Sequence, residues 1–266
     1  MKTNFRLFAV TLTLLSASLA GCLGGDDEDE GYSGPIDLVV YYESTSGMIE
    51  TSRTTGQPDQ ITGVTLSFDF ADTTSKDGNI TKITLDPDDG SDVIEGNPDD
   101  NAVLSYEWLT HGVFEINVGA EDAEGNSHEV EIVIRIDMHA VWTELNTNSA
   151  SMSFDATPDC EDGQPLAESI VVISTVTNQE APFWENGGNS DVTWKLQNPE
   201  EVEISSGDGT IADGGSETWE HTTEDVVEGF WTMDVEVTSG DSVNVENDVT
   251  ILYPEGSEDS PNPRTE

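Results

Sequence analysis

Apolar side chains recur at every second position in several stretches of this chain. Val64, Leu66, Phe68 and Phe70 form one such series, and the stretches 36–42, 114–120 and 130–136 repeat it. A period of two is typical of a β-strand with one buried and one solvated face. Turn-forming clusters such as TSKDGN and DAEGNS lie between the series, with no helical period among them. The pattern predicts short antiparallel strands of a β-sandwich.

A second group of alternating stretches follows Asp137. It includes Val192 to Leu196, Trp231 to Val237 and Val249 to Tyr253. Without the N-terminal segment and the tail, the chain has about 230 residues, which suit two domains of about a hundred residues each. We therefore expect an all-β chain with two immunoglobulin-like β-sandwich domains, the first over residues 36–137 and the second over residues 138–254.

The N-terminus has the three parts of a secretory signal peptide. Lys2 and Arg6 supply positive charge, Leu7 to Leu19 is an uncharged apolar run, and small residues precede Cys22. The run is too short to span a bilayer comfortably. The order Leu-Ala-Gly-Cys resembles the lipobox of prokaryotic lipoproteins, which implies cleavage after residue 21 and lipid on Cys22. The alternative is an ordinary signal peptide with a chance cysteine near the cut.

Acidic residues dominate the composition. The chain holds 55 acidic and 8 basic residues, and Lys2 and Arg6 leave with the signal peptide, so the expected mature chain has a formal charge of −49. Such a surface repels nucleic acid and anionic lipid, and salt screens its self-repulsion. The pattern resembles that of salt-adapted archaeal surface proteins, with marine bacteria as the alternative. We expect an acidic tether over residues 22–35 and a disordered acidic tail over residues 255–266.

The stretch from Gly63 to Ile136 resembles a PKD domain, an immunoglobulin-like module of archaeal and bacterial surface proteins. The segments SFDFADTTSKDGNITKITL and YEWLTHGVFEINVGAEDAEGNSHEVEIVI carry the resemblance. The sequence departs from the family in its central turn, where Leu85, Pro87 and Asp88 replace the tryptophan, an aromatic and a glycine. The resemblance implies a spacer or binding module and does not imply catalysis.

The turn DPDDGSD gathers carboxylates that could bind a hard cation. Asp86, Asp88, Asp89 and Asp92 are candidate calcium ligands, because Ca²⁺ takes clustered oxygens from a tight loop. The spacing is not that of an EF-hand, and the alternative is a solvated acidic turn. No cofactor is certain from the sequence, and Ca²⁺ at this turn is the one candidate.

Two further residues are candidate sites. Asn79 begins the glycosylation sequon Asn-Ile-Thr in a predicted turn. Trp184 lies in APFWENGGNSD, between two predicted strands, and is the best candidate for an exposed aromatic that stacks on a ligand. Its alternative role is loop packing. Trp194 and Trp231 lie in alternating stretches and are expected in the core.

No motif in the sequence indicates catalysis. There is no Gly-x-Ser-x-Gly elbow, no phosphate-binding glycine loop and no helical pair of histidines for zinc. We therefore predict a non-enzymatic, lipid-anchored protein on the outer cell surface that binds or scaffolds at the envelope. Its expected partners are the membrane, through the anchor, and an envelope protein or glycan. The alternative is an accessory carbohydrate- or protein-binding subunit of a secreted hydrolase.

Overall fold

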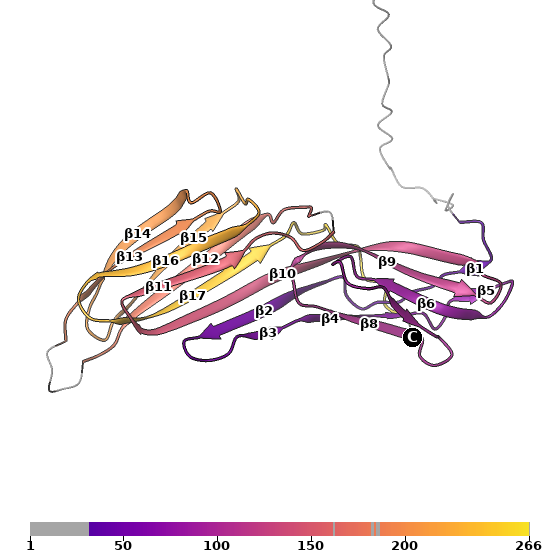
Figure 1. Ribbon diagram of the computed structural model, residues 1–266, viewed down its shortest axis with the longest axis horizontal. Coiled ribbons are helices and arrows are strands. Elements are labelled where there is room, and N and C mark those ends of the chain that lie inside the picture. The colour runs from indigo at the N-terminus through magenta and orange to yellow at the C-terminus, as the bar shows by residue number, and fades with distance from the viewer. Residues whose placement is uncertain (1–31, 162, 182–183, 185–186, 266) are drawn as a thin grey trace, which may run out of the picture. The chain divides into compact units, whose positions relative to one another are not determined.

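The computed structural model describes residues 32–161, 163–181, 184 and 187–265, and these residues contain strands and no helix (Figure 1). Burial follows the sequence pattern, since every second residue of β12 and of β13 is buried. The prediction of an all-β chain is confirmed. The strands are β1 Ile36–Asp37, β2 Ser46–Thr54, β3 Gln60–Thr62, β4 Val64–Asp69, β5 Thr74–Ser75, β6 Ile80–Asp86, β7 Ile94–Gly96, β8 Val103–Trp108, β9 Gly112–Asp122, β10 Ser127–Thr147, β11 Ser149–Asp155, β12 Ser169–Asn178, β13 Ser190–Gln197, β14 Glu203–Ile211, β15 Ser216–Thr223, β16 Phe230–Ser239 and β17 Val243–Leu252.

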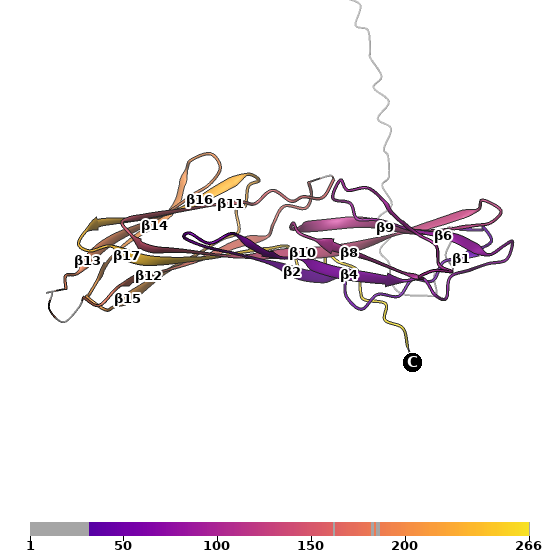
Figure 2. The ribbon, with the colours of Figure 1, turned by 60° about the horizontal axis from the view of Figure 1, so that its bottom comes forward.

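One large sheet runs through the described body. Its nine strands follow the order β15-β12-β17-β10-β9-β6-β7, with β2 paired to β10 and β3 paired to β2. The four-stranded sheet β11-β16-β13-β14 and the pairs β4-β8 and β1-β5 complete the fold. We call residues 34–136 the N-terminal lobe and residues 138–254 the C-terminal lobe. In each lobe, part of the large sheet packs against smaller sheets (Figure 2).

Strand β10 connects the two lobes. It pairs with β9 along Ser127–Ile136, with β17 along Met138–Thr147 and, in parallel, with β2 along Arg135–Thr143. A strand has only two edges. Some residues of β10 that pair with β2 also pair with β9, and others also pair with β17. Therefore β9 and β17 follow one another along one edge of β10, while β2 spans their meeting point on the other edge.

The expected domain boundary between residues 137 and 138 lies within β10. The described residues from Gly34 onward form one compact unit, to which Tyr32 and Ser33 do not belong. The separation of the two lobes as immunoglobulin-like domains stays a prediction. The predicted signal peptide and Cys22 lie outside the described residues.

The tryptophans in the alternating stretches are buried, as expected. Trp194 and Trp231 fill the C-terminal lobe, where the Trp194 indole donates to the Ser174 hydroxyl at 3.0 Å. In the N-terminal lobe, Trp108 is fully buried and its ring centroid lies 6.2 Å from that of Phe114. Hydrogen-bonded indoles of this kind bury a large apolar area without leaving a polar atom unpaired.

The acidic tail, expected to be disordered, lies against the N-terminal lobe instead. Asp259 accepts a hydrogen bond from the Thr45 hydroxyl on its carbonyl and from the Val133 amide on its carboxylate, and Asn262 forms a bridge with Tyr42. Val133 belongs to β10, whose edge there lies beyond the start of β2. These hydrogen bonds order the tail, although its acidic composition favours disorder. The tail also covers an edge of β10 that would otherwise be open.

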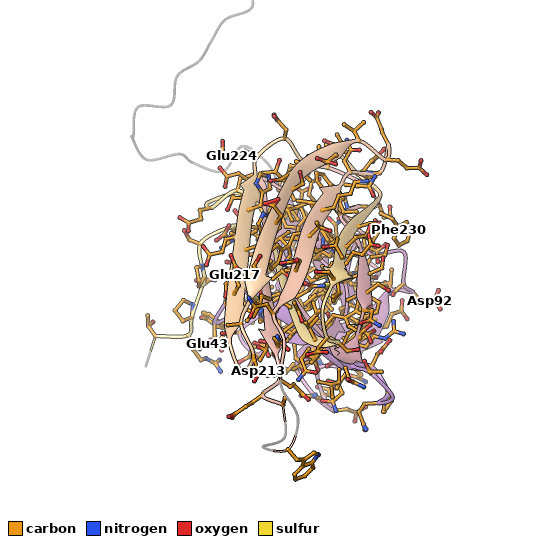
Figure 3. The ribbon with its side chains drawn as sticks, turned by 90° about the vertical axis from the view of Figure 1, so that its left-hand side faces the viewer. Glu43, Asp92, Asp213, Glu217, Glu224 and Phe230 are labelled. Atoms are coloured by element: carbon orange, nitrogen blue, oxygen red, sulfur yellow. The ribbon has the colours of Figure 1, made fainter. Side chains whose placement is uncertain are left out.

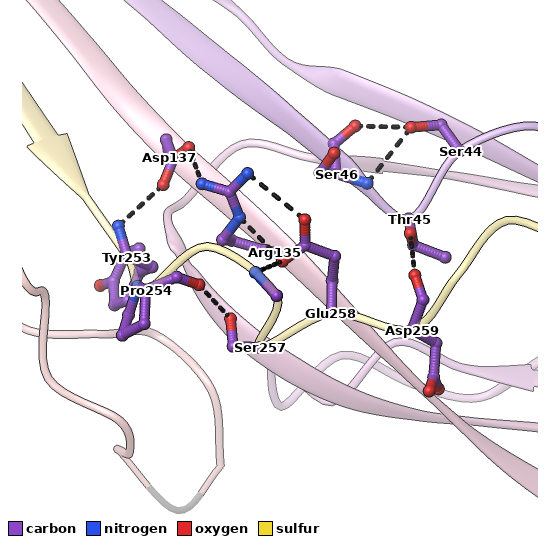
Figure 4. A network of polar contacts seen from close by, with 11 residues as sticks. Ser44, Thr45, Ser46, Arg135, Asp137, Tyr253, Pro254, Ser257, Glu258 and Asp259 are labelled. Carbon is purple, nitrogen blue, oxygen red and sulfur yellow. Dashed lines mark hydrogen bonds and ion pairs between the residues drawn. The ribbon is translucent and has the colours of Figure 1, made fainter.

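Arg135 anchors the same tail through a cluster of ion pairs (Figure 4). Its Nη1 lies 2.7 Å from Asp137 Oδ2 and its Nε lies 3.0 Å from Glu258 Oε2. Asp137 also accepts from the Tyr253 amide at 2.9 Å. The pKa of Asp137 is raised in total, because burial raises it by more than the Tyr253 amide and Arg135 lower it.

Candidate functional site

A groove with a volume of about 550 Å³ lies where the lobes meet. Its floor follows the register between β2 and β10, in which Met138 pairs with Ile49, Ala140 with Thr51 and Trp142 with Arg53. Alternate residues of a strand share a face, so these three pairs line one side of the sheet. The volume lies within the range of natural ligand sites, roughly 300–1,000 Å³.

Three other segments form the walls. The β8–β9 turn contributes Leu109 to His111, β11 contributes Met152 to Asp155, and β3 with its preceding turn contributes Asp59 to Ile61. Met152 and Phe154 are buried beneath the surface of the groove. Both lobes thus supply lining residues, and the groove depends on their meeting at β10.

Arg53, at one end of the groove, is the one lysine or arginine among the described residues that line it. The Arg53 guanidinium carbon lies 4.3 Å from the centroid of the Trp142 ring, and Arg53 Nε lies 3.4 Å from Asp59 Oδ1. The Trp142 indole donates to Glu144 Oε1 at 3.1 Å. The Trp142 ring and the Asp59 carboxylate both contact the guanidinium, while the Arg53 and Asp59 side chains stay 52% and 64% exposed.

His111 lies at the other end, between the lobes. Its Nδ1 lies 2.8 Å from the Tyr253 hydroxyl and its Nε2 lies 3.0 Å from the Asp155 carbonyl oxygen. Burial lowers the pKa of the imidazole despite the nearby carboxylates, and burial also raises the pKa of Tyr253. Because the Asp155 carbonyl oxygen can only accept, the neutral imidazole donates to it from Nε2, and Nδ1 accepts the hydrogen bond from the Tyr253 hydroxyl.

Charges in the lining are unequal. The described lining residues include three carboxylates, those of Asp59, Asp155 and Asp159, and one lysine or arginine, Arg53. Asp155 Oδ1 accepts from the Thr157 amide at 3.0 Å and from its hydroxyl at 2.7 Å. Asp59 is the partner of Arg53, so the carboxylates of Asp155 and Asp159 make the opposite end of the groove negative.

Large apolar side chains lie on the rim. Ile61 and Leu109 line the groove and are 58% and 51% exposed. Phe230, 65% exposed, pairs in register with Asp155 and points outward in Figure 3. In a chain with this net charge, exposed apolar side chains beside a groove favour a contact surface.

The candidate calcium ligands do not converge. Asp86 Oδ1 accepts from the Asp88 amide, Asp88 Oδ2 from the Glu115 amide at 2.8 Å, and Asp89 Oδ2 from the Tyr106 hydroxyl. Asp92 is exposed and points outward (Figure 3). Within the described residues, no group of three or more His, Cys, Asp or Glu side chains is arranged to hold a metal ion.

The other candidate sites lie away from the groove lining. Asn79 is exposed just before β6, and its carbonyl accepts from the Ala123 amide at 2.9 Å. Trp184 is 71% exposed, as its loop position predicts. Cys160 is buried, and its thiol donates to the Gln164 carbonyl at 3.4 Å. No helix among the described residues is long and apolar enough to cross a membrane.

Arg53 and Trp142 were not expected as site residues from the sequence. The available signals were that Arg53 is one of few basic residues in an acidic chain and that Trp142 follows a long alternating stretch. Their meeting depends on parallel pairing between strands far apart in the sequence, which no local pattern encodes.

Comparisons with known proteins identify no family. No family model matches the chain, and no curated protein matches it. A solved structure that explains the promiscuous specificity of carbohydrate-binding modules from the β-sandwich superfamily is 12% identical, with a TM-score of 0.30, covering 85% of this chain and 100% of that one. Tripeptidyl peptidase 2 is 7% identical with a TM-score of 0.27, over 81% of this chain and 20% of that chain.

A solved structure of a protein in complex with a glycan has a lower TM-score. The SGBP-B protein of the Bacteroides ovatus mixed-linkage glucan utilization locus, in complex with a heptasaccharide, is 10% identical with a TM-score of 0.17. The match covers 78% of this chain and 52% of that chain. Likeness at this level carries no information about the ligand or activity of this chain.

Proposed function

We propose that this protein is exported, anchored to the membrane by lipid on Cys22, and binds a ligand without catalysis at the cell surface. The groove at the meeting of the lobes carries the proposal. It combines an apolar floor, a few polar groups at its ends and a volume suited to a ligand.

The chemistry of the lining supports binding rather than catalysis. Both ring nitrogens of His111 have partners, and its burial favours the neutral form. The Arg53 guanidinium is stacked and ion-paired. Fixed groups of this kind orient a ligand, whereas a general base needs a nitrogen available to the proton that it removes.

The anchor rests on the sequence alone. The apolar run ending at Leu19 is cut away in such proteins, and lipid on Cys22 replaces it. Growth with radioactive fatty acid should label the wild-type protein and leave Cys22→Ser unlabelled. Label on both proteins, or on neither, would contradict the anchor.

The binding function is tested with a variant that fills the groove. Thr51 is half-buried and lines the floor, so Thr51→Trp should occupy the groove. Thr81→Trp, on an exposed position of β6, is the matched control. The fragment of each protein that begins at Gly34, called the soluble body below, is screened on glycan and peptide arrays. We expect ligands that bind the wild type and the control but not Thr51→Trp. Equal binding profiles for all three proteins would refute the proposal.

A further inference from the structure

We propose that the groove binds an extended, basic segment of a partner protein, which pairs with the free edge of β3 and places a lysine or arginine side chain over the apolar floor. The inference rests on the proposed function and specifies the ligand of the same groove. Three independent features of the groove support it: a strand edge, a charge imbalance and an apolar floor.

The strand edge comes from β3. Within the described residues, β3 pairs with β2 alone, and its three residues are exposed. Its other edge therefore offers backbone amides and carbonyls to a further strand. An extended peptide that adds to such an edge gains main-chain hydrogen bonds.

Side chains of an added strand would reach the groove. Asp59, Gln60 and Ile61 all line it, so the open edge of β3 runs along the groove wall. Every second side chain of a paired peptide points to the same face. One set of alternate side chains would therefore stand on the groove side of the sheet beside Ile61, from where a long side chain can lean over β3 toward the apolar floor formed by Ile49 and Met138.

Charge selects the side chain. Asp59 already pairs with Arg53, which leaves Asp155 and Asp159, at the opposite end of the groove, without a cation among the described lining residues. A lysine or arginine side chain has an aliphatic stem for the apolar floor and a charged head for these carboxylates. Met138 and Met152 adapt to stems of different shape. A neutral glycan would use neither the carboxylates nor the strand edge.

The probe is a seven-residue peptide of alternating valine and lysine, acetylated and amidated at its ends. Its affinity for the soluble body is measured by calorimetry at an ionic strength that shortens the Debye length to about 5 Å, because a strongly acidic protein attracts any cation. Two altered peptides accompany it. One carries acetyl-lysine in place of lysine, and the other carries N-methyl groups on all of its internal backbone nitrogens, which remove the N–H donors from both edges and prevent strand pairing.

Paired protein variants separate the groove from the general charge. Asp155→Asn with Asp159→Asn removes two groove carboxylates and keeps their shapes. Glu217→Gln with Glu220→Gln removes the same charge from β15, which lies outside the groove lining. We expect about a tenfold loss of affinity for the first pair and less than about twofold for the second.

The altered peptides have matching expectations. Acetylation and N-methylation should each weaken binding by about tenfold or more. Equal losses in the two protein pairs, or undiminished binding of either altered peptide, would overturn the proposal. A groove-dependent neutral glycan on the arrays, with no groove-dependent peptide, would overturn this ligand class and leave the binding function intact. If no ligand of any kind depends on the groove, both the proposed ligand class and the proposed binding function are refuted.

Discussion

The His111 Nδ1 atom lies 2.8 Å from the Tyr253 hydroxyl, although 142 positions separate the two residues in the sequence. His111 precedes β9 and Tyr253 follows β17, and these strands succeed one another along one edge of β10. The hydrogen bond therefore ties the lobes together at the end of the groove. Its environment is buried, so the loss of either partner should be costly.

Tyr253→Phe tests this bond. The substitution keeps the ring but leaves a buried imidazole nitrogen without its partner, and we expect a loss of about 1–3 kcal/mol in the free energy of unfolding. Urea denaturation of the soluble body measures it. Tyr41→Phe, which removes an exposed hydroxyl that donates to Asp72, is the control and should change stability by less than about 0.5 kcal/mol. Equal effects of the two substitutions would contradict the role of Tyr253.

The pH dependence of stability should report on His111. Burial lowers its pKa in the folded state below the usual value near 6.5, so the unfolded chain binds the proton more readily. Stability from this residue is complete above about pH 6.5 and declines as the pH falls toward the folded pKa. Melting curves of the wild type and of His111→Gln, compared from pH 7.5 to 5, isolate this effect from the titration of surface carboxylates. A constant difference between the two proteins would exclude it.

Arg135 should matter far more than other arginines. Arg135→Ala leaves Asp137, whose side chain is 8% exposed, without its cation, and we expect a loss of about 3–5 kcal/mol. Arg264 pairs with Asp69 and Asp72, but its side chain is 46% exposed. For that reason Arg264→Ala should cost only about 0–1 kcal/mol. The reverse order of the two losses, measured by urea denaturation, would show that the tail is not held as described.

Added salt should raise the melting temperature. A formal charge of −49 on the expected mature chain implies strong self-repulsion, which screening reduces as the Debye length falls from about 30 Å at 0.01 M to about 3 Å at 1 M. Calorimetric scans over this range in sodium chloride measure the gain. A melting temperature that does not change with ionic strength would refute this.

Local alternation predicted several of the longer strands. The alternating series that begin at Val64, Phe114 and Val249 fall on β4, β9 and β17, since burial on one face imposes a period of two, and their last residues Phe70 and Tyr253 lie just beyond β4 and β17. The series from Ile36 to Tyr42 was less informative. Only Ile36–Asp37 forms a strand, and Tyr41 and Tyr42 make isolated bridges.

Long-range pairing could not be predicted. The boundary expected at Asp137 lies within a strand of 21 residues, because β10 changes partners there without any change in its alternation. The tail illustrates the same limit. Its composition favours disorder, but Glu258 and Asp259 meet Arg135 and Thr45, which are distant in the sequence. The groove follows from these pairings, so its residues were missed as well.

Four methionines of the expected mature chain provide the most direct test of the groove. Met138 and Met152 line it, whereas Met48 lies on the opposite face of β2 from Ile49, and Met233 is buried in the C-terminal lobe. The soluble body, labelled with ¹³C at the methionine methyl groups, is titrated with the valine–lysine peptide. We predict that the Met138 and Met152 signals shift with a common affinity while those of Met48 and Met233 stay in place. Shifts confined to Met48, or spread equally over all four signals, would contradict a ligand site in the groove.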